Sequence, residues 1–453
     1  MAEATADASA RIARMSVFQL AWPVMIANIL QTLTTTVDVI MVGSLGAEAP
    51  AAVAAVGFGG QFIFLFFSVM ISVSAGTIAL VARAIGANRL EEADHVLKES
   101  LVLGALLSIP LTLFGLVFAE PMLAAFGAEA EVVTLGGAYI RIISLVVFFQ
   151  FIGFLGSAAL RGAGDTVTPL WIGVLVNIVN FVINVNLIFG NAFVPRLGVP
   201  GAAIGTSISY VVGALILLAI LVRGRGRLKL HLSGSWVDME TVRRIFRIGW
   251  PAALEQILLQ VAFLLWVGMV VVFGTEILAA HQIGLRIQSF AFMPGFGFAI
   301  AATALVGQNL GARDAVAAER SGWEATKFSV AVMSVIAIVI FLLAEPIARG
   351  FIGDPVVVSW SVTFIRIHAI SIPAVGIFFA IDGALRGAGD TRFPLMTSLS
   401  GMYAVRLPLS LVFGFVLGWG IVGVWIPLVI EYYYRSVVIA NHFRRGKWKA
   451  LRV

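Results

Sequence analysis

Leu160–Thr166 reads LRGAGDT, and the same seven letters return unchanged at Leu385–Thr391, 225 residues further along the chain. Further pairs repeat at this spacing or nearly so: YIRI at 139–142 with FIRI at 364–367, Pro169-Leu170 with Pro394-Leu395, and Trp22-Pro23 with Trp250-Pro251. The chain of 453 residues therefore contains one structural unit twice, each copy filling about half of its length.

The composition identifies the surroundings of this repeated unit. Hydrophobic residues make up 60% of the chain and charged residues only 12%, against roughly 45–50% and about 25% in soluble domains. So little charge cannot cover a water-exposed surface of this length, which excludes a large soluble protein. A membrane-spanning helix needs about 20 apolar residues. The sequence predicts twelve spans, at residues 16–42, 52–82, 98–118, 135–160, 168–190, 199–222, 246–273, 277–306, 325–344, 358–385, 392–416 and 420–441.

Lysine and arginine are distributed unevenly between the loops that join these spans. With the N-terminus inside, 24 of the 30 basic residues lie on the inner side, and only Arg196 and Arg349 lie in outer loops. This count takes the tail from Arg435 to Arg452 as an inner segment. Cytoplasmic loops of membrane proteins carry such an excess, so we expect a multi-pass protein of the cell (inner) membrane with both termini cytoplasmic. Topology also accounts for the net charge of +6, and nucleic acid is not expected as a partner.

Each half contains six predicted spans, so both halves enter the membrane from the same side. The predicted fold class is an all-α membrane protein, with twelve helices in two parallel six-helix bundles related by pseudo-twofold symmetry. The expected boundaries are 1–222 for the N-terminal bundle, 223–245 for a basic cytoplasmic linker, 246–441 for the C-terminal bundle and 442–453 for a basic cytoplasmic tail. Within the linker, Ser235–Asp238 resembles a helix capping box. Either a helix on the inner surface or a solvated connector fits this segment.

Four polar residues of the N-terminal bundle are expected at similar depth: Asp38, Asn180, Asn184 and Thr206. At about 1.5 Å per helical residue, all four fall in the outer half of that bundle. Asn180 and Asn184 are four residues apart and therefore share a helix face. A carboxylate, two amide carbonyls and a hydroxyl are hard oxygen ligands, which suit an alkali cation, and the carboxylate can equally take a proton. The alternative is that the asparagines only link helices by hydrogen bonds.

Glu255 and Asp382 lie in apolar spans of the C-terminal bundle, and uncharged residues stand at the matching positions of the first half. Charge inside a membrane is costly, so such residues are candidates for function. Buried together, two carboxylates are expected to share a proton or a cation, because like charges in a low dielectric do not both stay ionised. The alternative is an ion pair with Arg286 or Arg406.

Several motifs together resemble the multidrug and toxic compound extrusion (MATE) family over essentially the whole chain. They are Pro23 followed by VDVIMVG at 37–43, the two LRGAGDT loops, AAHQ at 279–282 and PAALE at 251–255. The resemblance implies a secondary exporter without a cofactor, which uses inward Na⁺ or H⁺ flow to expel organic cations. It also implies a cation site at Asp38 and its neighbours. The NorM-like branch carries a Glu and an Asp at the positions of Glu255 and Asp382, whereas the branch that lacks them depends on the first-half site alone. This chain has both sets, so Na⁺ is a candidate ion at Asp38 or at Glu255 and Asp382, and which site drives transport stays open.

The sequence thus favours export of small cationic amphipathic drugs or dyes, because acids at positions 38, 255 and 382 complement a cationic cargo. We expect a lipid-embedded monomer that works by alternating access, with Pro23 and Pro251 as hinges. The alternative is a flippase for a lipid-linked or amphipathic substrate, which would call for cationic residues along its cavity.

The Gly-Ala-Gly-Asp segments also resemble the Gly-x-Gly-Asp signature of intramembrane aspartyl proteases. Here the signature occurs twice, in short loops just past a helix end, where a glycine C-cap and an aspartate that accepts from the next backbone amides explain it better. The sequence contains no cysteine, no His-Glu-x-x-His and no phosphate-binding lysine loop. An enzyme is therefore not expected.

Overall fold

The computed structural model describes residues 16–191, 194–231 and 238–451. These residues form helices joined by short loops, with no β-strand among them beyond an isolated bridge between Arg225 and Leu228. The helices of the first half are α2 (Val17–Gly43), the 3₁₀ turn η1 (Gly46–Glu48), α3 (Ala49–Gly86), α4 (Leu90–Ala125), α5 (Ala130–Ser144), α6 (Val147–Gly162), α7 (Val167–Phe189) and α8 (Val199–Arg223).

The second half has the same order of long helices, with one of them broken into shorter pieces. Its elements are α9 (Met239–Val271), α10 (Thr275–Gly311), α11 (Ala315–Leu342), α12 (Ala344–Phe351), α13 (Pro355–Gly387), α14 (Arg392–Leu399), the π-helical η2 (Ser400–Arg406), α15 (Leu407–Leu411), the π-helical η3 (Val412–Val416), α16 (Gly420–Arg445) and the 3₁₀ turn η4 (Lys447–Ala450). Within the described ranges, eleven helical segments are long and apolar enough to cross a membrane, and α5 with α6, bent by 54°, makes a twelfth. The predicted all-α membrane fold is confirmed.

The chain divides into two compact units whose boundaries fall inside helices. One unit contains the chain up to Met25, a short piece around Gly86–Asn88 and everything from Trp250; the other contains the rest. Helices α2 and α9 therefore each begin in one unit and end in the other. This differs from the sequence-based boundaries, which assign residues 1–222 to one bundle. Both helices change unit within two residues of a proline, Pro23 in α2 and Pro251 in α9.

Close packing holds each helix start in its unit. Val17 and Ala21 at the start of α2 share a hydrophobic cluster with Phe298 of α10. In the other unit, Gly249, the last residue of α9 before the helix changes unit, lies so close to the Ser72 backbone on α3 that a Cβ atom would collide with the Ser72 carbonyl. Glycine at this position therefore permits the helix approach.

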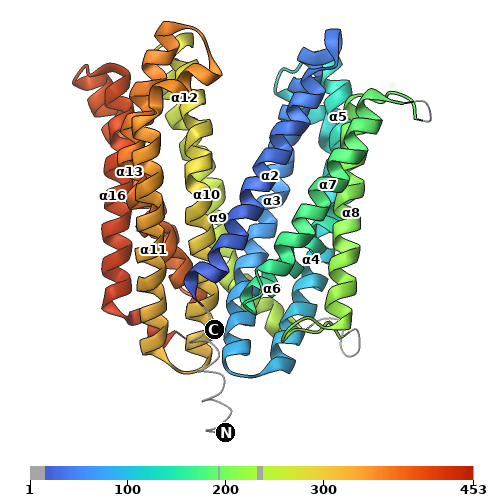
Figure 1. Ribbon diagram of the computed structural model, residues 1–453, viewed down its shortest axis with the longest axis vertical. Coiled ribbons are helices and arrows are strands. Elements are labelled where there is room, and N and C mark those ends of the chain that lie inside the picture. Colours follow the sequence, from blue (N-terminus) through green and yellow to red (C-terminus); the bar gives the residue numbers. More distant parts are fainter. Residues whose placement is uncertain (1–15, 192–193, 232–237, 452–453) are drawn as a thin grey trace. The chain divides into compact units, whose positions relative to one another are not determined.

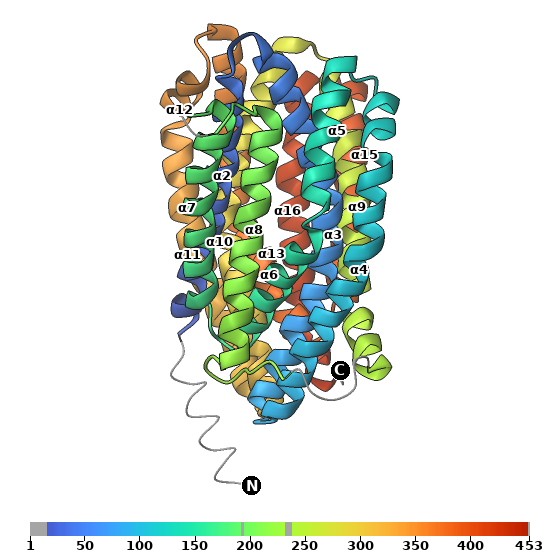
Figure 2. The same ribbon diagram turned by 90° about the vertical axis from the view of Figure 1, so that its right-hand side faces the viewer.

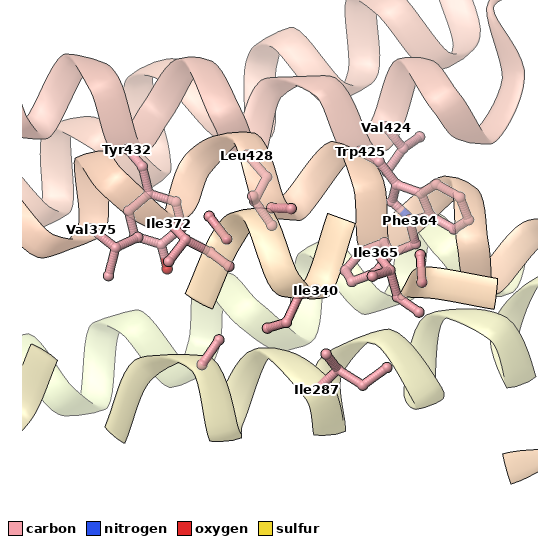
Figure 3. Packing of buried hydrophobic residues seen from close by; sticks show 14 of the residues in the cluster. Ile287, Ile340, Phe364, Ile365, Ile372, Val375, Val424, Trp425, Leu428 and Tyr432 are labelled. Atoms are coloured by element: carbon pink, nitrogen blue, oxygen red, sulfur yellow. The ribbon is translucent and has the colours of Figure 1, made fainter. Parts of the chain in front are cut away.

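The core of the second-half unit lies between helices that run side by side, namely α10, α11, α13 and α16 (Figure 1). Figure 3 shows Phe364 of α13 against Trp425 of α16, and their ring centroids are 5.0 Å apart. In the first-half unit, α7 packs along α8 (Figure 2). Between helices surrounded by lipid, such contacts stabilise through van der Waals packing rather than removal from water.

The two LRGAGDT copies fold into the same turn. Gly164 and Gly389 have φ values of +90° and +84°, and the next amides, of Asp165 and Asp390, each donate back to a helix carbonyl at 2.8 Å. These are glycine C-caps. The Asp165 carboxylate then accepts from the backbone amide of Thr168, and that of Asp390 from the amide of Phe393. Both aspartates hold the turn, as the capping interpretation predicts.

The linker ends directly in α9. Ser235 of the expected capping box lies outside the described residues, but Asp238 accepts hydrogen bonds from the His95 ring at 2.9 Å and the Thr241 hydroxyl at 2.7 Å. These bonds lower the pKa of Asp238 from its ordinary 3.8 to about 2, and the bond from His95 has the largest effect. The Asp238 amide donates to Glu99 on α4. The second part of the expected linker is thus the first turns of α9.

Candidate functional site

The four residues predicted for the N-terminal bundle lie together within one unit. The Asn184 amide donates to the Asp38 carboxylate at 2.8 Å and to the Asn180 carbonyl oxygen at 3.3 Å. The Asn180 amide in turn donates to the Thr206 hydroxyl at 3.1 Å. Helices α2, α7 and α8 each supply part of this group, which we name the Asp38 cage. The sequence pattern therefore identified neighbours in space.

The hydrogen bonds inside the Asp38 cage do not use all of its oxygen acceptors. Both asparagine amide groups donate within the cage, whereas the buried Asn184 Oδ1 has no hydrogen-bond partner among the described residues. Gly205 on α8 packs directly against this oxygen, and a Cβ at Gly205 would collide with it. No ion pair joins Asp38 to a cationic group within the described ranges. A carboxylate with spare neutral oxygens can coordinate a cation or bind a proton.

Sequence reasoning missed two tyrosines beside the Asp38 cage. Tyr139 of α5 and Tyr210 of α8 both lie within electrostatic range of the Asp38 carboxylate. The Tyr139 ring packs so closely on Gly59 that a Cβ would overlap it. The signal available in the sequence was the position of Tyr210, one helical turn beyond Thr206 on the same face.

Glu255 and Asp382 also lie together, but a guanidinium group stands between them. Arg386 Nε donates to both Asp382 oxygens at 2.8 and 3.0 Å, and its Nη2 donates to Glu255 Oε2 at 2.6 Å. We name Glu255, Arg386 and Asp382 the acid triad. With all three ionised, its net charge is one negative. The side chains of Asp382 and Arg386 are 13% and 18% exposed.

A second triad of opposite charge follows in the same unit. Glu431 of α16 accepts from Arg406 at 2.6 Å and from Arg435 at 2.9 Å. These three residues, here named the basic triad, carry a net charge of one positive and are almost completely buried. Ser398 of α14 connects the triads, because its hydroxyl donates to Glu255 at 2.5 Å and accepts from Arg435 at 2.6 Å.

These contacts correct two sequence-based expectations. The ion pair that was the alternative for Glu255 and Asp382 is present, but the partner is Arg386, one turn from Asp382, and not Arg286 or Arg406. Arg286 is exposed on α10, and Arg406 pairs with Glu431. Arg435, counted with the cytoplasmic tail, is buried inside α16. Its i,i+4 spacing from Glu431 within an apolar span was the signal that could have revealed the pair.

Comparison with known proteins agrees with this architecture. The MatE family model matches the chain twice, over residues 23–186 and 251–412. The probable multidrug resistance protein NorM of Thermotoga maritima is 30% identical over 440 residues, covering 96% of this chain and 93% of the relative. An outward-facing multidrug resistance MATE family transporter of the MOP superfamily has a TM-score of 0.89 at 25% identity, covering 96% and 97% of the two chains.

A third similar protein is a MOP superfamily transporter from Pyrococcus furiosus, described as having a binding pocket of reverse polarity that suggests a different function. Its TM-score is 0.88 at 25% identity, and the match covers 96% of each chain. The repeated helices and their intramembrane charges thus define a multi-span membrane transporter, not an enzyme. The chain belongs to the MatE family.

Proposed function

We propose that this transporter exports organic cations in exchange for inward Na⁺ or H⁺. The observation that carries the proposal is the Asp38 cage, whose carboxylate has no cationic partner among the described residues. An ionised carboxylate inside a membrane is costly in free energy unless a positive charge compensates it. In the cage that charge comes from solution, as Na⁺ or as a proton on Asp38. Asn180, Asn184 and Thr206 would supply the neutral oxygen ligands of Na⁺.

The acid triad is the proposed contact for the exported cation. Its single negative charge and its partial exposure, through Asp382 and Arg386, support this assignment. A net negative charge attracts cationic drugs and repels anions. Two similar proteins bear names that include multidrug resistance, which agrees with a broad range of cationic, drug-like substrates.

Alternating access is the proposed mode of transport, with Pro23 and Pro251 as hinges. Both prolines interrupt the backbone hydrogen bonding of a long helix, and α2 and α9 change from one compact unit to the other at these points. A bend there lets one unit move while each helix stays continuous. The transporter is further proposed to act as a monomer in the cell (inner) membrane with both termini cytoplasmic.

A flippase for a lipid-linked or amphipathic anionic substrate is the second candidate. The basic triad is the observation that favours it, because its net charge is positive. However, Arg406 is only 4% exposed and Arg435 only 6%, and both are paired with Glu431. Of the two triads, the acid triad is the partly exposed one, which supports the cation exporter.

Efflux from proteoliposomes tests the proposed function. A Na⁺ gradient and a H⁺ gradient are imposed in separate experiments. At least one of the two, acting alone, should drive uphill export of a cationic dye such as ethidium by the purified protein. Glu255→Gln and Asp382→Asn should each reduce export at least tenfold, and the double variant should be little worse than the worse single one, because the two carboxylates act through one site. Export of an anionic lipid analogue, without dye efflux under either gradient, would favour the flippase instead.

A further inference from the structure

Arg386 occupies the position that a bound cation would take between Glu255 and Asp382. Its Nε faces one carboxylate and its Nη2 the other, at distances of 2.6 to 3.0 Å. The planar guanidinium group therefore donates to both carboxylates simultaneously, through N–H groups that point in two different directions. An ammonium or a spherical ion offers no such fork. The arrangement of the two carboxylates matches a guanidinium group in both charge and shape.

The other copy of the repeat shows that the arginine does not need these partners to be present. Arg161 is the repeat mate of Arg386, and Ser157 stands at the position of Asp382. Arg161 forms no ion pair with any residue in the described ranges, and its buried Nε has no hydrogen-bond partner there. Both halves thus carry the arginine, but only the second half has an aspartate one turn before it, which makes Arg161 a matched control.

The surrounding charges determine how much positive charge the site can accept. The basic triad lies one hydroxyl away, through Ser398, and its surplus positive charge offsets the surplus negative charge of the acid triad. A second full cation beside Arg386 would leave the connected network with a net positive charge in a low dielectric. An incoming cation is therefore favoured when it replaces Arg386 rather than when it binds beside it.

We propose that Arg386 is a tethered occupant of a guanidinium-binding site formed by Glu255 and Asp382, and that organic cations with a guanidinium or amidinium group compete with it for these carboxylates. This inference rests on the proposed function, because it specifies the cargo of the acid triad. Competition with a tethered group lowers the apparent affinity of the cargo and so aids its release. Asp382 and Arg386 are the partly exposed members of the acid triad, so the exchange begins at these two side chains.

Equilibrium binding of radiolabelled methylguanidinium to the full-length protein in lipid nanodiscs tests the inference. Arg386→Ala should bind methylguanidinium at least tenfold tighter than the wild type, because the internal competitor is gone. Arg161→Ala should stay within about twofold of the wild type. Adding Glu255→Gln to Arg386→Ala should abolish the gain. Tetramethylammonium, which has charge but no N–H donors, should displace little of the label.

Arg386→Lys covers the case in which the alanine variant fails to fold. It keeps the positive charge but loses the fork, so a gain of severalfold in methylguanidinium affinity is expected. Unchanged affinity in Arg386→Lys or Arg386→Ala, or an equal gain in Arg161→Ala, would overturn the inference. An equal gain for tetramethylammonium would overturn its guanidinium selectivity. Wild-type protein that exports no cation under any gradient would instead refute the proposed function, independently of these binding results.

Discussion

Thr206 and Glu431 are repeat mates on α8 and α16, and so are Tyr210 and Arg435. Around Thr206 the first half has a carboxylate, Asp38, with amide and hydroxyl neighbours and no cationic partner among the described residues. Around Glu431 the second half has two arginines bound directly to the carboxylate. Each half thus has a carboxylate near this pair of matching positions, contributed by a different helix, with its own cations in the second half and without them in the first.

The difference extends to the position that matches Asp38. In the second half this position is Trp266, and the Arg406 guanidinium lies over its ring at 5.1 Å from the centroid. A cation on an aromatic face is a favourable contact. The second half therefore carries a permanent positive charge where the first half offers an oxygen site. We therefore propose that the basic triad stabilises its bundle, while the Asp38 cage exchanges its ion with the solution.

The largest expected effect is on folding and concerns Glu431. Glu431→Gln leaves Arg406 and Arg435 buried without their counter-charge, and breaking a buried pair in this way costs about 3–5 kcal/mol. We expect a large loss of stability in detergent, measured by denaturant unfolding, and a low yield of folded protein. Glu276→Gln, at an exposed carboxylate on α10, is the control and should change little. A loss below about 1 kcal/mol for Glu431→Gln would show that the basic triad is not structural.

An intermediate effect on ion dependence is expected from Asn184. Asn184→Ala removes the donor to Asp38 and the spare Oδ1, so the half-saturating concentration of the coupling ion should rise about tenfold, the equivalent of one charge-assisted hydrogen bond. Initial export rates at graded ion concentrations measure this. Asn186→Ala is the matched control, because Asn186 lies on the same helix but donates to the Val182 carbonyl. Equal shifts in both variants would contradict a ligand role for Asn184.

The smallest effect concerns Asp238, which fastens the start of α9 to α4. Its pKa of about 2 lies below the ordinary 3.8, so its ionised form stabilises the fold fully above about pH 4, and this contribution disappears as the pH falls towards 2. Asp238→Asn should lower the unfolding temperature at neutral pH by on the order of 1 °C, since the pair with His95 is exposed. The difference in unfolding temperature between Asp238→Asn and the wild type should disappear as the pH falls from 4 to 2. A constant difference across that range would assign the effect to something other than charge.

Much of the fold was predictable, because each physical signal for it is local. Apolar runs of sufficient length define the spans, and the LRGAGDT repeat defines the duplication. The change of unit inside α2 and α9 was not predictable, because it depends on which neighbours the first turns contact. The break in the helix from α14 to η3 has a partly local cause, because Pro408 lacks the N–H that a regular α-helix needs. The matching residue in the first half is Ile183, and α7 continues through it.

The candidate sites divide in the same way. The Asp38 cage could be assembled from depth and helix face, since its members are the few polar residues of their spans. The partner of Glu255 and Asp382 could not be chosen, because several arginines lie at compatible depth and only packing selects Arg386. Gly401 faces the Arg435 side chain, and a Cβ at this position would collide with it. The matching residue in the first half is Val176. Only the structure reveals that this space belongs to a buried ion pair.

The central claim is that the coupling ion binds in the Asp38 cage and the exported cation at the acid triad. Its most direct test compares two transport modes in proteoliposomes at matched protein content: uphill, ion-driven export and passive exchange of labelled for unlabelled substrate. Asp38→Asn should abolish ion-driven export and keep exchange within about twofold of the wild type, whereas Glu255→Gln should lose both. Ion-driven export that survives Asp38→Asn, or exchange that falls as far as in Glu255→Gln, would contradict the claim.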